Sequence, residues 1–481
     1  MFETSFLLFL KHLIVNIIIP LIPWILFLRI FYWNKFKWLL FYLLSRFVWV
    51  WVIAFSVLNI QFIHFWIWIR EYVIILLILI AALTAKILIK KLQIKEYFET
   101  LKLKNIFPEI KNSFSILSKV EKIFTIIIIL FAVYFVCVSW IFNFNLPTYA
   151  DDSFWNRDRP AYNIYTDWWI KLFWTENEIL WRWRLGYPIQ IPAYKALISS
   201  FTWWINDIYF NTWQRLVFLF WLLFIFSITF EWTKNIFKSS LPIWLIISLP
   251  LVFFHSFEWY MEVPSIIYCI ICVRLFYKYL EDKDFDSLSL WLLFWFIISY
   301  IKNDGFVVYF PWLIFAFIVV LCLKKELQSM IKWLFKNKNN LFKSIWYFLY
   351  FFLPFLLVKM VHWLWFNQAA WADSWVWLSN TIHWEIFSQF PHIFFKMDNY
   401  NTILIILLFI FFVIFQRKKN NNENLFLYSW LAIFLVLIAV FLFTDNYRFV
   451  MDQTTVNRVF TTCFVLLLWF SGFLLDNKKI W

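Results

Sequence analysis

The sequence predicts an all-α, polytopic integral membrane protein with about thirteen transmembrane helices. Of its 481 residues, 64% are hydrophobic, whereas a soluble domain has about 45–50% apolar residues. The mean hydropathy is +0.73. Apolar runs of about 20 residues, long enough to cross a bilayer core as a helix, recur from one end of the chain to the other.

The apolar runs define the expected spans in order. The first run contains Pro20 and Pro23 and lacks a small-residue cleavage site, so we expect a retained span and no cleaved signal peptide. The expected spans are residues 6–29, 38–60, 70–89, 121–144, 212–232, 241–257, 263–280, 286–302, 306–323, 343–364, 401–416, 426–444 and 456–474.

The net charge is +14, but the basic residues cluster between the expected spans. We therefore interpret them as setting the orientation of the chain in the membrane, and not as a nucleic-acid surface. The clusters fall on alternate connections, which the positive-inside rule places in the cytoplasm: residues 29–37, 90–122, 234–238, 278, 324–343, 417–419 and 478–479.

Two segments do not read as spans. The connection 90–122 mixes lysine with apolar residues and predicts an amphipathic cytoplasmic surface helix, whereas the short, proline-flanked run 189–205 predicts a helix in the outer interface. We therefore divide the chain into an N-terminal part, 1–120, and a larger membrane region, 121–481, with an outer loop at 145–211.

Tryptophan and glycine occur in unusual numbers. The chain has 3 Gly and 35 Trp, whereas the usual share of about 7% would give about 34 glycines. We favour the hypothesis that a stop-like codon read as glycine in the source organism was translated here as tryptophan. The alternative is a protein truly rich in tryptophan, with aromatic belts at both membrane interfaces.

Cysteine and histidine give no sign of metal or redox chemistry. The C-x-x-C of Cys269 and Cys272 lies inside an expected span without a histidine or carboxylate pattern, so we interpret these thiols as packing residues. The six histidines are scattered without ligand spacing, and we expect no histidine metal site.

Asp151 and Asp152, in "PTYADDSFWNRDRP", follow the span 121–144 on the outer face. Adjacent carboxylates at the bilayer edge repel each other, which raises the pKa of one of them. Such a carboxylate suits a general base for a hydroxyl acceptor. The alternative is a solvated loop, or pairing of these aspartates with Arg157 or Arg159.

Other outer turns carry candidate binding residues. Lys302 in "YIKNDGF", beside Asp304, either holds a lipid-linked phosphate or extends to the interface. Arg448 and Arg458 flank the last outer turn and offer bidentate phosphate contacts, or anchor the chain at the interface. Glu262 in "EWYMEVP" either binds sugar hydroxyls or lies in an exposed turn.

The order of five motifs, "ADDSFW", "LGYPIQIP", "EWYMEVP", "IKNDGF" and "TTVNRVF", resembles membrane glycosyltransferases of the GT-C superfamily. The likeness is greatest to bacterial relatives of protein O-mannosyltransferases and of the lipid A aminoarabinose transferase, and covers about Glu121 to Trp481. The sequence departs from the superfamily pattern in three ways. "YPIQIP" lacks the second adjacent proline, and Met261 and Glu262 replace Ala-Asp. Three spans precede the motif-bearing part, where superfamily members usually have one.

The resemblance implies inverting transfer of a sugar from a polyprenyl-phosphate donor to a hydroxyl of an extracytoplasmic glycan, lipid or protein, at the cell (inner or plasma) membrane. The resemblance implies no cofactor and does not exclude a divalent metal ion. Asp151 would be the base, with Asp152 as its partner or substitute. The substrate-binding set would be Lys302, Arg458, Arg448, Arg159, Glu262, Tyr187 and Asp304.

Two other functions fit a chain of this kind. A lipid-linked glycan polymerase or ligase shares the lipid carrier, but its large outer loop is expected late in the chain. A transporter or flippase of a lipid-linked substrate usually shows internal repeats and broken spans at mid-membrane, and the sequence has no obvious repeat.

The glycine hypothesis predicts the mass of the native protein. Glycine at Trp259 would turn "EWYMEVP" into "EGYMEVP", closer to the Gly-Tyr-Ala-Asp-Leu-Pro-like turn of the superfamily. Mass spectrometry of the protein from its source should give a mass below the 59.6 kDa of the printed chain. A mass that agrees with 35 tryptophans would contradict the hypothesis.

Overall fold

The fold is described from a computed structural model. It describes residues 106–145, 159–167, 190–202, 212–257, 262–282, 285–301, 309–323, 327–336, 381–396, 424–453 and 456–474, together with isolated positions at 7, 10–11, 13–15, 78, 81–82, 84–85, 325, 342, 345, 349 and 379.

The described part of the chain is helical and contains no β-strand, so the all-α prediction is confirmed there. Its α-helices are α5 (Ile106–Ile116), α6 (Lys119–Asn145), α8 (Arg159–Asp167), α10 (Gln190–Thr202), α12 (Thr212–Thr233), α13 (Ile236–Ile247), α14 (Pro250–Phe257), α15 (Glu262–Asp282), α16 (Phe285–Ile301), α17 (Phe310–Leu323), α18 (Leu327–Lys336), α21 (Ile386–Pro391), α23 (Asn424–Phe443), α24 (Tyr447–Met451) and α25 (Val456–Leu474). A short π-helix, η5 (His392–Lys396), continues α21.

Helices α6, α12, α15, α16, α17, α23 and α25 begin and end within a few residues of expected spans. Two stretches, Lys119–Phe142 and Leu425–Phe443, are long and apolar enough to cross a membrane, and the bent pair α13–α14 gives a third. The expected spans at 6–29, 38–60, 70–89, 343–364 and 401–416 lie wholly or largely outside the described residues. The total of thirteen spans, and the division at residue 120, therefore stay predictions.

The expected single span at 241–257 is not one straight helix. The structure has two helices there, α13 and α14, whose axes make an angle of 85°. Pro250 is the physical reason, because proline lacks an N–H and its ring clashes with the preceding helical turn. The N–H of Ser248 closes α13 instead, by donating to carbonyls of its last turn. Beyond the bend, the buried Ser256 Oγ donates to Ser139 Oγ of α6 at 2.7 Å.

The amphipathic helix predicted within 90–122 is present as α5, from Ile106 to Ile116. Ser118 and Glu121 form a capping box at the start of α6. Ser118 N–H donates to Glu121 Oε2 at 2.9 Å, and Glu121 N–H donates to Ser118 Oγ at 3.3 Å. Ser113 Oγ of α5 accepts the N–H of Ile236 at 2.8 Å, which joins α5 to the first turn of α13.

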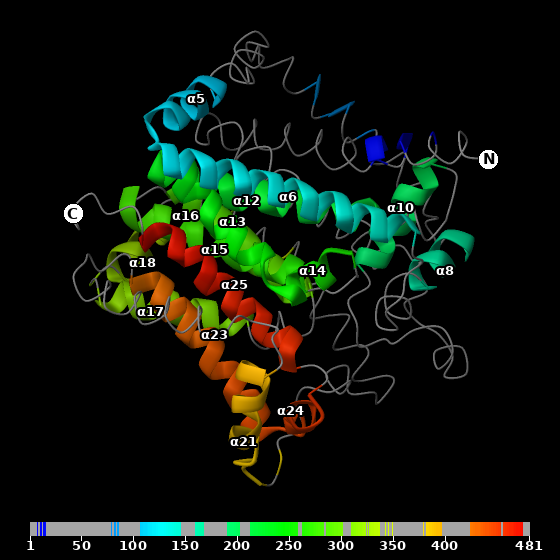
Figure 1. The fold of residues 1–481 in the computed structure, drawn as a ribbon. Coiled ribbons are helices and arrows are strands. Elements are labelled where there is room, and N and C mark those ends of the chain that lie inside the picture. Colours follow the sequence, from blue (N-terminus) through cyan, green and yellow to red (C-terminus); the bar gives the residue numbers. More distant parts are fainter. Residues whose placement is uncertain are drawn as a thin grey trace.

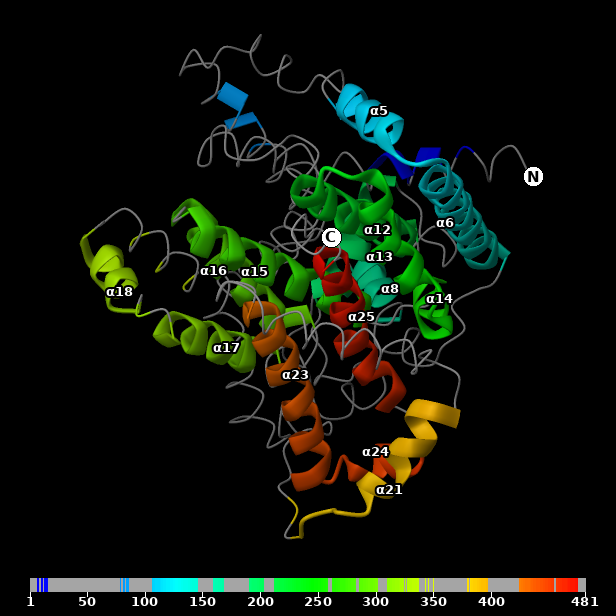
Figure 2. The same cartoon turned by 60° about the vertical axis from the view of Figure 1, so that its left-hand side comes forward.

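Helix α15 lies in the middle of the bundle, between α16 and α25 (Figures 1 and 2). Most of the buried apolar side chains form one large cluster in which aromatic rings pack closely; the rings of Phe276 and Phe317 stack with centroids 4.3 Å apart. Leu117, Phe230 and Ile236 form a small second cluster. Cys269 and Cys272 are buried in the large cluster and form no disulfide, so their interpretation as packing residues is confirmed.

One ion pair is buried between α12 and α15. Arg274 Nη2 lies 3.3 Å from Glu231 Oε2, and the guanidinium lies over the Trp232 ring, 4.0 Å from its centroid. Arg274 is only 6% exposed. Its Nε and Nη1 atoms are buried without a hydrogen-bond partner. The Glu231 carboxylate and the Trp232 ring face are therefore the closest groups that balance the charge of Arg274.

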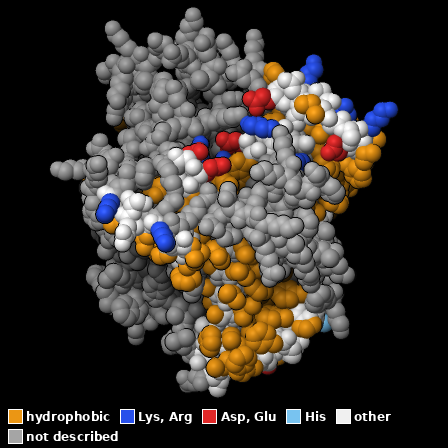
Figure 3. Space-filling model, turned by 90° about the vertical axis from the view of Figure 1, so that its left-hand side faces the viewer, with side chains coloured by type: hydrophobic (Ala, Val, Ile, Leu, Met, Phe, Trp, Pro, Cys, Tyr) orange, Lys and Arg blue, Asp and Glu red, His pale blue; other side chains and the backbone are white. Residues whose placement is uncertain are grey.

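The surface divides into charged and apolar parts. Figure 3 shows basic and acidic side chains gathered in the upper part of one face and hydrophobic side chains covering the part below. Helices α5 and α18, which belong to two lysine-rich connections, lie away from α21 and α24 in Figures 1 and 2. Apolar surface next to a charged end is the pattern of a helical membrane protein.

We predict that Glu231→Ala lowers the stability of the bundle by about 3–5 kcal/mol, because it leaves the buried Arg274 without its counter-charge. Thermal unfolding in detergent, followed by tryptophan fluorescence, measures the effect. The matched control is Glu109→Ala, which removes an exposed carboxylate on α5. Equal unfolding temperatures for the two variants would contradict the prediction.

Candidate functional site at the α21–α24 end

The structure describes four of the nine site residues expected from sequence: Arg159, Glu262, Arg448 and Arg458. Arg159 and Glu262 are the first residues of α8 and α15. Helix α8 packs with α10 and lies apart from α24 in Figure 1. The other five lie outside the described residues: Asp151, Asp152, Tyr187, Lys302 and Asp304.

Arg448 and Arg458 belong to consecutive helices at one end of the bundle. Arg448 is an exposed residue of α24, and Arg458 is a half-buried residue in the first turn of α25. Gln453, in the turn between them, has a positive φ of 60° and donates from Nε2 to Gln389 Oε1 at 3.4 Å. The last outer turn predicted from sequence therefore holds both arginines and contacts α21.

A second segment docks on the end of α23. The N–H groups of Ser379 and His383 donate to the carbonyl oxygens of Phe443 and Leu442, at 2.9 and 3.0 Å. These are the final carbonyls of α23, which have no partner within the helix. Residues 379–383 therefore lie against the end of α23, close to the start of α24.

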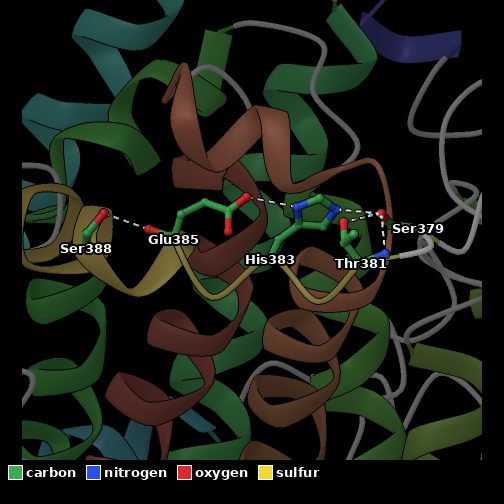
Figure 4. A network of polar contacts seen from close by, with 5 residues as sticks. All are labelled: Ser379, Thr381, His383, Glu385 and Ser388. Carbon is green, nitrogen blue, oxygen red and sulfur yellow. Dashed lines mark hydrogen bonds and ion pairs between the residues drawn. The ribbon is translucent and has the colours of Figure 1, made fainter.

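Within this segment three polar side chains are connected in a row (Figure 4). The Ser379 Oγ lies 2.7 Å from His383 Nε2, and His383 Nδ1 lies 2.8 Å from Glu385 Oε1. An ionised carboxylate only accepts hydrogen bonds, so Nδ1 carries a proton. In a neutral imidazole Nε2 is then the acceptor, and the Ser379 hydroxyl donates to it. We call these residues the Ser379–His383–Glu385 row.

The imidazole in the middle of the row is held on its ring face. The His383 ring stacks on the Tyr447 ring of α24, with centroids 3.6 Å apart and planes at 7°. His383 is only 7% exposed. The stacking, together with the backbone bond to α23, fixes the plane in which the two ring nitrogens face their partners.

The two ends of the row differ in their surroundings. Ser379 Oγ also accepts the Thr381 N–H at 3.3 Å. Glu385 is exposed, and hydrogen bonds from its own backbone N–H and from His383 lower the pKa of its carboxyl. The carboxylate is therefore ionised at neutral pH, as the hydrogen-bond direction above requires.

Exposed apolar residues lie close to His383 in the sequence. Ile382, Trp384 and Phe387 are 46%, 63% and 42% exposed, and the Trp384 and Phe387 rings stack on each other. Ile382 and Trp384 flank His383 along the chain, and Phe387 lies in the first turn of α21.

The sequence analysis assigned no role to Ser379, His383 or Glu385, because it treated the histidines as scattered. The spacing S-x-x-x-H-x-E was the available signal. Spacing of this kind is not specific, since only the turn between residues 379 and 385 aligns the three side chains. In the part of the chain that the structure describes, no group of three or more His, Cys, Asp or Glu residues could hold a metal ion.

Comparisons of the chain with protein-family models, with curated proteins and with solved structures gave no match. The resemblance to the GT-C superfamily therefore rests on the five sequence motifs alone.

The lowered pKa of Glu385 predicts a pH dependence of stability. A carboxyl whose pKa falls on folding stabilises the fold above its unfolded pKa of about 4.3, and loses that contribution as the pH falls through the lower folded value. Wild type should therefore unfold at a higher temperature than Glu385→Gln at pH 7. The difference should shrink as the pH is lowered below about 4. Thermal unfolding in detergent at a series of pH values measures it; a difference that does not vary with pH would contradict the prediction.

Proposed function

We propose that the chain is a membrane glycosyltransferase that moves a sugar from a polyprenyl-phosphate donor to a hydroxyl of an extracytoplasmic acceptor, with inversion at the anomeric carbon. The five motifs in superfamily order support this proposal. So does the location of the last of them, at the start of α25 beside α24.

The observation that carries the proposal is the pair Arg448 and Arg458, held in consecutive helices at the end of the bundle away from α5 and α18, which belong to lysine-rich connections. A guanidinium binds phosphate through two parallel N–H donors. Two such groups at one end of an apolar bundle suit a phosphate whose polyprenyl tail lies in the surrounding lipid. Because the lysine-rich ends are expected in the cytoplasm, the proposed site faces the outside.

The proposed chemistry needs one base and cations on the leaving group. Phosphate is a weak base, so it leaves without a strong general acid. Asp151, or Asp152 in its place, would remove the proton of the acceptor hydroxyl as that oxygen attacks the anomeric carbon. Arg458 and Lys302, with Arg448 and Arg159 as further candidates, would stabilise the negative charge that develops on the phosphate oxygen. Glu262, Tyr187 and Asp304 would bind the sugar.

We predict that Asp151→Asn lowers sugar transfer by about 10²–10⁴-fold, the usual contribution of a general base. Membranes that contain the protein are incubated with radiolabelled polyprenyl-phosphate mannose, and the label that leaves the lipid donor for acceptors in the same membranes is counted. Asp282→Asn, at the far end of α15, is the matched control and should keep full activity.

Full transfer by both Asp151→Asn and Asp152→Asn would contradict the proposed base. Movement of the labelled lipid across the membrane with its sugar–phosphate bond intact would indicate a transporter instead. Assembly of long glycan chains on the lipid carrier would indicate a polymerase.

A further inference from the structure

We propose that Ser379, His383 and Glu385 form a second site, in which the Ser379 hydroxyl is a nucleophile that takes an acyl group from a carboxylic ester. This activity differs from sugar transfer. It uses none of the residues assigned to the glycosyltransferase, so either proposal can fail without the other.

The geometry of the row is that of an activated hydroxyl. A nucleophile and its base are expected within about 2.6–3.2 Å, with a third group that orients the base. The two links measure 2.7 Å from Ser379 Oγ to His383 Nε2 and 2.8 Å from His383 Nδ1 to Glu385 Oε1. Both fall in that range, and the serine and the carboxylate lie on opposite nitrogens of one ring.

The segment does not need the Ser379 hydroxyl or the Glu385 carboxylate in order to dock. The backbone N–H groups of Ser379 and His383 already join it to the end of α23. The stacking of His383 on Tyr447 adds a second attachment. The Ser379 hydroxyl and the Glu385 carboxylate, each on one ring nitrogen of His383, are therefore not needed for attachment. Acyl transfer by a serine does need this alignment.

The reaction has two balanced steps. Ser379 Oγ attacks the ester carbonyl carbon while His383 Nε2 takes the hydroxyl proton. The new Oγ–C bond forms, the ester C–O bond breaks, and His383 returns the proton to the departing alcohol. Water then attacks the acyl-serine carbonyl carbon and gives a proton to Nε2. The Oγ–C bond breaks, Nε2 returns the proton to Ser379 Oγ, and a carboxylic acid is released. The Glu385 carboxylate stabilises the imidazolium in both steps.

The surroundings favour an ester with an apolar acyl chain. Ser379 is half-buried rather than enclosed. Ile382 and Phe387, close to His383 in the sequence, are exposed and provide apolar surface on which a chain can lie. The shared chemistry is an acyl ester, either in a membrane lipid or in a soluble molecule.

A fluorophosphonate probe tests the proposal, because it forms a covalent adduct only with an activated serine. The full-length protein in detergent is treated with fluorophosphonate–rhodamine, and the modified peptide is located by mass spectrometry. We expect the adduct on Ser379, its loss in Ser379→Ala, and labelling at least about a hundredfold slower in His383→Gln.

The matched control is Ser388→Ala. Ser388 is exposed on α21, and its hydroxyl donates to the Glu385 carbonyl oxygen at 2.6 Å rather than to an imidazole. This variant should be labelled as wild type is. Because Ser379→Ala removes a single oxygen atom, an unchanged circular dichroism spectrum shows that loss of labelling is not loss of fold.

Two substrates distinguish the sources of the ester. Release of oleate from dioleoylphosphatidylglycerol vesicles indicates a membrane lipid, and release of nitrophenol from p-nitrophenyl butyrate indicates a soluble ester. Folded wild-type protein that gains no adduct would overturn the proposal. An adduct on any serine other than 379, or equal labelling of wild type and Ser379→Ala, would overturn it as well.

Discussion

The fold follows from one constraint: in apolar surroundings, the peptide N–H and C=O groups must be bonded within the segment itself. Helices meet this requirement along their length and fail only at their ends. Wherever a helix ends, some other group must supply the missing partner. The capping box of Ser118 and Glu121, the bend after Ser248, and the segment docked on α23 are three answers to the same requirement.

Polar chemistry is concentrated at helix ends for the same reason. The middle of the bundle is filled by aromatic and branched side chains around α15. The Arg274–Glu231 pair is an exception: Glu231 is near the end of α12, but Arg274 lies within α15, where a carboxylate and the Trp232 ring balance its charge. At the opposite end, the carbonyls of Leu442 and Phe443 attract the N–H groups of residues 379 and 383. That attachment places His383 against Tyr447 and so builds the polar row.

The two proposed sites would place two different reactions at the same end of the protein. The arginines of α24 and α25 suit a phosphate, and the Ser379–His383–Glu385 row suits an ester. A polyprenyl-phosphate donor, and an ester if it belongs to a membrane lipid, would approach through the lipid and present the polar head at the end of the bundle. A surface of this kind explains why exposed apolar residues such as Trp384 border charged ones.

The sequence alone determined the helical class and the approximate bounds of the longest described helices, because about 20 apolar residues in a row have few alternatives to a helix. It also indicated which turns share a face, through the positions of the lysines. It did not determine the break between α13 and α14, although Pro250 was visible, since proline is tolerated in membrane helices when neighbours satisfy the freed groups.

Only the tertiary structure revealed the polar row. Ser379, His383 and Glu385 are near each other in sequence, but in a free chain nothing selects the turn that aligns them. Their alignment depends on the end of α23 and on the Tyr447 ring, which come from a part of the chain about 60 residues later. Periodicity and charge are local properties that a sequence displays directly. A hydrogen-bonded row held in place by a distant helix end exists only once the helices have packed.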